Sequence, residues 1–385
     1  MTDLTRYPSV HFMRERARTR LPHFAWEFLD SSTGIETGKE RNESAFREIE
    51  LVPRMLPGNI EAQTETELFG QTYAAPFGVA PVGMSGLIWP KAEIFLARAA
   101  AQMRLPYTLS TVGAETPETI GPEVGDYGWY QYYPTKKMDV RDDILKRGKD
   151  NGFKTLVITV DVPVTSTRER QLRAGLRMPP KKDLATLWHA ARRPSWSLAT
   201  LAHKTPHLVT LEKYHSDNDD LRSFLATMLH GRPDWDDVSA VRDLWDGPVI
   251  LKGIMDVGDA VEAAKRGFDG IVVSNHGARQ CDGVPASITV LPEIASEVGG
   301  KMKIIFDSGI RSGLDIARAM ALGADFCLLG RPFLYAVAAL GEAGGQHVMQ
   351  VLKDDYANNL LQLGVENVES LRSLKIRGRP TPTNW

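Results

Sequence analysis

The chain has 385 residues, of which 43% are hydrophobic and 24% are charged, a composition that excludes a disordered chain and suits a soluble protein with a large core. Its 46 basic and 48 acidic residues leave a formal net charge of -2, so it lacks the overall positive field that supports binding to nucleic-acid phosphates. We therefore expect no nucleic-acid partner.

Residues 1–70 precede the first predicted strand, and we expect them to form a cap that contains a helix at Pro22–Leu29. The first segment, MTDLTRYPSVHFMRERARTRLPHF, carries basic residues but no uninterrupted apolar stretch of the kind found in secretion signals. Nowhere does an apolar run reach membrane-spanning length. We expect neither secretion nor a transmembrane anchor.

From about residue 75, short apolar runs alternate with longer amphipathic stretches, a pattern typical of repeated β/α units and a parallel sheet. Gly152, Gly267 and Gly323 follow predicted helices at positions where a left-handed residue is favoured. No GxGxxG turn follows the first strand, which favours a closed barrel over an open dinucleotide-binding sheet. The prediction is an α/β fold, an eight-stranded parallel β/α (TIM) barrel, with strands at Phe77–Val82, Pro106–Ser110, Trp129–Gln131, Thr155–Asp161, Val249–Lys252, Gly270–Ser274, Ile304–Asp307 and Phe326–Leu329.

The alternation breaks between Asp161 and Val249, where a long segment rich in Pro, Lys, Arg, His and Trp intervenes. We interpret residues 175–230 as a loop inserted after the fourth strand of a single domain that spans residues 1–385. Cationic side chains interleaved with Trp and Leu suit a peripheral membrane contact or a lid. A solvated loop that packs on a neighbouring subunit is the open alternative.

Two cysteines, Cys281 and Cys327, fall in segments predicted to belong to the barrel and lack CxxC spacing. They predict neither a disulfide framework nor a zinc site, and we expect no metal. A reducing compartment fits this pattern, so we expect a cytoplasmic protein.

Nearly every predicted strand ends in polar or ionisable residues, at the barrel end where catalytic groups collect. Because each buried polar group costs free energy unless it is paired, so many at one rim predict a functional site. The segment VVSNHGARQ is the most specific, since His276 directly follows a strand and Arg279 lies three residues on. Asp161, at an earlier strand end, could orient the imidazole of a general base.

Five motifs follow one another along the chain, namely TVDVP, LKG, SNHGARQ, DSGIRSG and LGRPF. In this order they resemble the motifs of the FMN-dependent 2-hydroxy acid dehydrogenase and oxidase family, and the resemblance covers most of the chain. The family includes glycolate oxidase, lactate dehydrogenase and mandelate dehydrogenase. MSGLIWPKAE, RERQL and the basic insertion are most similar to its membrane-associated mandelate and lactate dehydrogenases. The resemblance implies FMN-dependent oxidation of an (S)-2-hydroxy acid or derivative, reoxidation by a quinone or other acceptor, a homotetramer, and an optional position on the inner face of the cell membrane.

The same resemblance implies roles for individual residues. His276 would be the catalytic base, with Asp161 supporting its protonated form. Arg279 and Arg168 would bind the substrate carboxylate, and Tyr133 would hydrogen-bond the substrate. Lys252 would lie near the flavin N1 and O2, where positive charge favours the reduced ring. The flavin ring would contact Pro81, Val82, Gly83, Ser110, Gln131 and Thr159, the ribityl chain Asp307, and the phosphate Gly309, Arg311, Gly330 and Arg331. Ser274 would be a further FMN contact.

The sequence departs from the family where Leu21-Pro22 leads to Phe28 in place of a tyrosine that helps to bind the substrate carboxylate. One hydrogen bond worth roughly 1.5–3 kcal/mol is therefore missing. The following segment, DSSTGIETGKERN, also differs from the usual loop. We hypothesise a shifted substrate, such as a bulkier hydroxy acid, an ester, an amide or a modified peptide.

Other interpretations stay open from sequence alone. Gly83 and Val112 resemble the dehydrogenase branch, but an oxygen-dependent 2-hydroxy acid oxidase is the nearest alternative. A flavin-dependent isomerase of a phosphorylated isoprenoid is an alternative from another enzyme class, and it would need metal or diphosphate ligands at the positions of His276 and Arg279. A catalytically silent barrel used for binding is the third.

Overall fold

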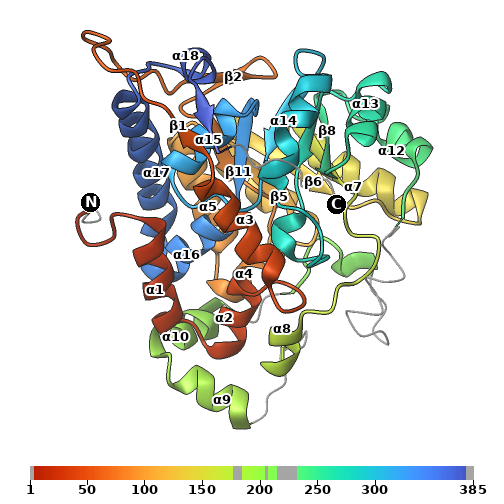
Figure 1. Ribbon diagram of the computed structural model, residues 1–385. Helices are drawn as coiled ribbons and strands as arrows, with labels where there is room; N and C mark the ends of the chain where they lie inside the picture. Colours follow the sequence, from red (N-terminus) through yellow and green to blue (C-terminus); the bar gives the residue numbers. More distant parts are fainter. Residues whose placement is uncertain (1–3, 177–183, 204–206, 215–231, 379–385) are drawn as a thin grey trace.

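A computed structural model describes residues 4–176, 184–203, 207–214 and 232–378. Eight parallel strands close into a barrel, in the order β10-β11-β4-β5-β6-β7-β8-β9, and helices surround it (Figure 1). The barrel strands are β4 (Phe77–Val79), β5 (Tyr107–Ser110), β6 (Gly128–Tyr132), β7 (Thr155–Thr159), β8 (Val249–Ile254), β9 (Gly270–Val273), β10 (Lys303–Phe306) and β11 (Phe326–Leu329). The TIM-barrel prediction is confirmed, and each predicted strand matches one of these within three residues at either end.

Helices follow the barrel strands in the expected alternation. They are α4 (Ser85–Ile88), α5 (Ala92–Gln102), α6 (Pro117–Val124), α7 (Met138–Asp150), α8 (Glu169–Arg173), α9 (Leu184–Ala191), α10 (Pro194–His203), α12 (Trp235–Arg242), α13 (Val257–Lys265), α14 (Ser287–Val298), α15 (Gly313–Ala321), α16 (Arg331–Leu340), α17 (Ala343–Gln362) and α18 (Val368–Arg372), with short 3-10 turns η1 (Gly125–Tyr127), η2 (Glu212–Tyr214) and η3 (His276–Ala278). Gly152, Gly267 and Gly323 have positive φ just after α7, α13 and α15, as predicted.

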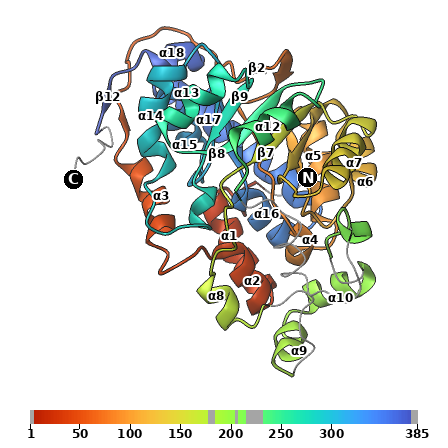
Figure 2. The same ribbon diagram turned by 90° about the vertical axis from the view of Figure 1, so that its right-hand side faces the viewer.

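The N-terminal residues wrap the barrel on the side of α16. They form α1 (Val10–Arg20), α2 (His23–Asp30) and α3 (Thr37–Arg47), and α1 packs along α16 while α3 contacts η3 and α14. The predicted helix at Pro22–Leu29 is α2. Figure 2 shows α8 beside α2, and α9 and α10 at the lower edge of the molecule.

Alternation along the strands decides which side chains fill the barrel. In β7 to β10, every second side chain packs against the outer helices. The side chains between them point into the barrel, and these are Val157, Ile250, Val272 and Ile305. A hairpin of β2 (Thr66–Leu68) and β3 (Gln71–Tyr73) supplies Leu68 and Tyr73 to the same inner cluster. A further antiparallel pair, β1 (Glu50–Leu51) and β12 (Ile376–Arg377), joins the segment after α3 to the C-terminal part of the chain. The barrel is therefore filled at its base and can hold polar groups only nearer its rim.

The predicted insertion at residues 175–230 lies partly outside the described residues. Its described part forms α9, α10 and η2. Within the part of the chain that the structure describes, no helix is both long enough and apolar enough to cross a bilayer.

Candidate active site

The inward-facing register of the strands continues into polar residues at their carboxyl ends. Two residues beyond Val157 comes Thr159, two beyond Ile250 comes Lys252, and Ser274 and Asp307 follow Val272 and Ile305 in the same way. Because side chains two apart point to the same face, these polar groups form a layer above the apolar filling. All four are buried.

One half of this layer is a chain of neutral hydrogen bonds. The Ser110 hydroxyl donates to Gln131 Oε1 at 2.7 Å, and Gln131 Nε2 donates to Thr159 Oγ1 at 3.0 Å. These three side chains come from β5, β6 and β7, which are adjacent in the barrel. They present amide and hydroxyl groups to whatever lies above them.

The other half of the layer centres on Lys252. Its Nζ donates to Ser274 Oγ at 2.9 Å and lies 3.0 Å from Asp307 Oδ2. Burial lowers the pKa of Lys252, but the charges of Asp307 and Asp161 more than offset this and raise it above the ordinary value. The side chain is therefore a fixed cation at the strand ends.

His276 and Asp161 form the pair that the sequence predicted. Nδ1 of His276 lies 2.9 Å from Asp161 Oδ1, which assigns the proton to Nδ1 and leaves Nε2 as an acceptor. Burial lowers the pKa of His276, and the charge of Asp161 opposes this without reversing it. Burial raises the pKa of Asp161, but the charges of His276 and Lys252 lower it overall. A neutral imidazole beside an ionised carboxylate is thus the resting arrangement.

Gly253 makes room for this carboxylate. It has a φ of +109°, and a Cβ at this position would lie 2.4 Å from Asp161 Cβ. A side chain there would push Asp161 away from His276. The glycine of the LKG motif is therefore required because a side chain would not fit there, a requirement that was not predicted from the sequence.

Two partly buried arginines face the same region without a carboxylate partner among the described residues. Arg279 Nη1 donates to Phe28 O at 3.0 Å and Ser31 O at 3.4 Å, and its guanidinium carbon lies 5.4 Å from the centroid of the Phe28 ring. Arg168 donates to Ser166 Oγ at 3.2 Å. Burial, and then the charge of Arg168, lowers the pKa of Arg279 well below its ordinary value. Such cations favour an anionic ligand.

Tyr133 lies close enough to Asp161, Lys252 and the two arginines to interact with their charges. Burial and the charge of Asp161 raise the pKa of Tyr133 to about 12, while Lys252, Arg168 and Arg279 oppose the increase. The phenol therefore stays protonated and can donate a hydrogen bond.

The other predicted residues lie in the loops after β4, β10 and β11. Arg331 donates to three backbone carbonyls, those of Leu29, Ser31 and Gly277. Arg311, in contrast, has carboxylate partners: its Nη2 donates to Glu43 Oε1 at 2.8 Å, and its backbone amide donates to Asp315. Gly309 and Gly330 lie at the ends of β10 and β11, and Pro81, Val82 and Gly83 follow β4.

Some positioning residues were missed because they are far apart in sequence. Asn42 on α3 and Asn275 exchange two amide hydrogen bonds, at 2.9 and 2.7 Å. Asp282 accepts from the amides of Thr37 and Gly38 at the start of α3. Ser308 links Asp307 to the Gly277 amide. These bonds fix the loop at 274–279, where His276, Gly277 and Ala278 all have positive φ. The available signal was that Asn275 lies within SNHGARQ and Ser308 within DSGIRSG; Asn42 and Asp282 lie outside both motifs.

Comparisons with known proteins identify the family that the chain matches. A family model described as FMN-dependent dehydrogenase matches residues 17–377. An L-lactate dehydrogenase of Pseudomonas entomophila (strain L48) is 38% identical over 362 residues, covering 93% of this chain and 95% of the relative. One from Vibrio cholerae serotype O1 (strain M66-2) is 37% identical, with 93% and 96% covered.

Solved structures of mandelate-oxidising enzymes are also similar to this chain. The chain is similar to the monotopic membrane protein (S)-mandelate dehydrogenase, with a TM-score of 0.90, 30% identity, and 96% of this chain and 99% of that chain covered. It is also similar to mandelate oxidase, with a TM-score of 0.83, 33% identity, and 96% and 98% covered.

Proposed function

This chain belongs to the FMN-dependent dehydrogenase family, and from that premise we propose that it oxidises an (S)-2-hydroxy acid, or a derivative of one, to the 2-oxo product. The observation that carries the proposal is the His276–Asp161 pair, 2.9 Å apart, beside two partly buried arginines that have no carboxylate partner among the described residues. The lactate and mandelate enzymes to which the chain is similar act on substrates of this class.

In this proposal His276 takes the hydroxyl proton at Nε2, because Nδ1 already donates to Asp161. Asp161 then stabilises the imidazolium, as an orienting carboxylate does for a general base. Arg279 and Arg168 bind the carboxylate, with Phe28 against Arg279. Tyr133 donates a hydrogen bond to the substrate.

The polar layer and the loops after β10 and β11 fit FMN. Lys252 offers a fixed cation, and Ser110, Gln131 and Thr159 offer amide and hydroxyl groups of the kind that a flavin ring binds. We assign Pro81, Val82, Gly83 and Ser274 to the ring, Asp307 to the ribityl chain, and Gly309, Gly330, Arg311 and Arg331 to the phosphate. FMN, when bound, supplies the two-electron acceptor for the hydrogen on the substrate α-carbon.

We assign reoxidation to a quinone at a membrane surface. The mandelate dehydrogenase with the similar structure is a monotopic membrane protein. Three large apolar side chains of α9 and α10, namely Trp188, Leu198 and Leu201, are exposed, with 61%, 67% and 81% of their surface accessible. Apolar side chains beside cationic ones suit an interfacial contact. A cytoplasmic homotetramer, peripheral on the membrane, completes the proposal.

An anaerobic screen tests the proposed chemistry. The FMN-loaded enzyme is mixed with (S)-2-hydroxy acids and their esters, and loss of flavin absorbance is followed in time. We expect His276→Asn to retain FMN and to lose roughly 10²–10⁴-fold in reduction rate, the usual contribution of a general base. His11→Asn, an exposed histidine on α1, is the matched control and should behave as the parent enzyme. Full reduction speed in His276→Asn would overturn the assignment.

A further inference from the structure

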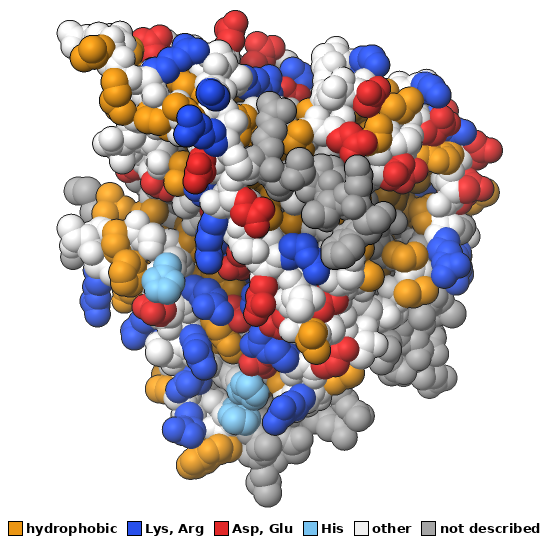
Figure 3. Space-filling view, viewed as in Figure 1, with side chains coloured by type: hydrophobic (Ala, Val, Ile, Leu, Met, Phe, Trp, Pro, Cys, Tyr) orange, Lys and Arg blue, Asp and Glu red, His pale blue; other side chains and the backbone are white. Residues whose placement is uncertain are grey.

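A polar cavity lies between the N-terminal cap and the insertion, away from the strand-end site. Its volume is about 550 Å³, which falls within the range of roughly 300–1,000 Å³ common for small-molecule sites. Lys, Arg and His side chains gather over this part of the surface, in the lower half of Figure 3. It is lined by Arg14, Arg18, Leu21, His23, Trp26, Glu27, Asp30, Lys39, Arg170, His189, Arg192 and Arg193.

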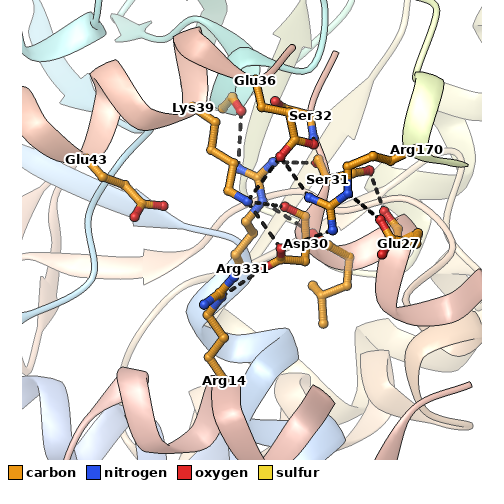
Figure 4. A network of polar contacts seen from close by, with 12 residues as sticks. Arg14, Glu27, Asp30, Ser31, Ser32, Glu36, Lys39, Glu43, Arg170 and Arg331 are labelled. Atoms are coloured by element: carbon orange, nitrogen blue, oxygen red, sulfur yellow. Dashed lines mark hydrogen bonds and ion pairs between the residues drawn. The ribbon is translucent and has the colours of Figure 1, made fainter. Parts of the chain in front are cut away.

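The two carboxylates of the lining are already neutralised. Asp30 is at the centre of a network in which Arg14 Nε donates to it at 2.7 Å and Lys39 Nζ at 3.2 Å (Figure 4). Glu27 pairs with Arg170 at 2.5 Å. Burial raises the pKa of Asp30, but Arg14 and Lys39 lower it overall, so the carboxylate stays charged and occupied.

The remaining cations of the lining have no such partner. Arg18, Arg192 and Arg193 form no ion pair with a described carboxylate. Arg193 donates instead to Leu21 O at 3.0 Å, and Arg192 lies over the Trp188 ring at 5.9 Å. The lining therefore carries an excess of positive charge around one half-open cavity.

We propose that this cavity binds a phosphate-bearing anion. Guanidinium groups match phosphate oxygens with paired, charge-assisted hydrogen bonds, and three of them are available here from two separate elements. A soluble phosphate compound and a lipid headgroup present the same chemistry to these side chains.

The segment Phe28–Ser31 contacts both the cavity lining and the side chains of the strand-end site. On one side, the Asp30 carboxylate contacts Arg14 and Lys39. On the other, the carbonyls of Phe28 and Ser31 accept from Arg279, and Ser31 O also accepts from Arg331. An anion that competes with Asp30 for its cations shifts this segment, so its binding should alter how Arg279 holds the substrate.

Calorimetric titration of the FMN-loaded enzyme with pyrophosphate tests the site without depending on turnover. We expect Arg18→Ala with Arg192→Ala to weaken binding roughly tenfold or more, since the variant removes two guanidinium groups that can form charge-assisted hydrogen bonds to phosphate oxygens. Both side chains are exposed and form no described hydrogen bond, so the variant should fold. Arg16→Ala with Arg47→Ala also removes two exposed arginines, on α1 and α3, but both lie outside the lining, so this variant should bind as the parent does.

Co-sedimentation with phosphatidylglycerol vesicles identifies the source of the phosphate. If vesicle binding also falls in the double variant and pyrophosphate competes with it, the site accepts a lipid phosphate. If only pyrophosphate binding falls, the ligand is soluble. Pyrophosphate binding that is equal in the parent and the double variant, or absent in both, overturns the proposal, whatever the enzyme's activity on hydroxy acids.

Discussion

The ring of Phe28 lies over the Arg279 guanidinium, 5.4 Å from its central carbon. A tyrosine in its place would keep this stacking and add a donor near the position that we assign to the substrate carboxylate. The substitution thus isolates a single hydroxyl group within an unchanged volume.

Phe28→Tyr should therefore raise kcat/KM for small 2-hydroxy acids by roughly 10- to 100-fold, the equivalent of one hydrogen bond to a charged group. Methyl esters of the same acids are the matched control, because they lack the carboxylate charge and should gain little. Steady-state kinetics with a dye acceptor measures both. An equal gain for acid and ester would contradict a role for Phe28 in carboxylate binding.

At the scale of the element, Glu93 on α5 is buried and connects this helix to the loop after β5. Its Oε1 accepts from the Ala114 amide at 2.8 Å, and its Oε2 has no partner among the described residues. Burial raises the pKa of Glu93 to about 7 from an ordinary value of 4.5. The folded protein therefore binds more protons than the unfolded chain between these values, and the wild type loses stability as the pH rises through this window.

Glu93→Gln removes this titration. We expect the difference in free energy of unfolding, Glu93→Gln minus wild type, to increase by about 1–3 kcal/mol as the pH rises from 5 to 8, since one unit of pKa corresponds to about 1.4 kcal/mol. Thermal unfolding at several pH values measures the difference. A constant offset at every pH would show that Glu93 does not titrate in this way.

The strands and their polar ends could be predicted because they are local patterns. Apolar runs of β-branched residues set β7 to β10, and the polar residue that ends each run reaches the rim by alternation alone. The pairing of Asn42 with Asn275, or of Asp30 with Arg14, depends on how the cap folds back onto the barrel. Nothing in the spacing of these residues encodes that approach. Arg311 illustrates the same limit, since its partner Glu43 lies on α3.

At the scale of the whole molecule, α9 and α10 lie together at the lower edge in Figure 2 and carry the exposed apolar side chains Trp188, Leu198 and Leu201. The same segment contributes His189, Arg192 and Arg193 to the lining of the cationic cavity. An interface with anionic lipid would cover both features at once, the apolar side chains in the acyl boundary and the cations at the headgroups. Quinone turnover and vesicle binding should therefore both depend on side chains that are remote from His276.

Leu198→Glu with Leu201→Glu should reduce vesicle binding by roughly tenfold or more, because burying each leucine is worth about 1.5–3 kcal/mol and the new charges oppose insertion. Turnover with a lipid-embedded quinone should fall in parallel, while turnover with a water-soluble dye should stay unchanged because neither leucine touches the proposed site. Leu361→Glu, an exposed leucine on α17 with 42% of its surface accessible, adds a charge elsewhere and should leave both properties intact. If the double variant sediments with vesicles as well as the parent does, the contact lies on another face, and α9 and α10 then pack on a neighbouring subunit.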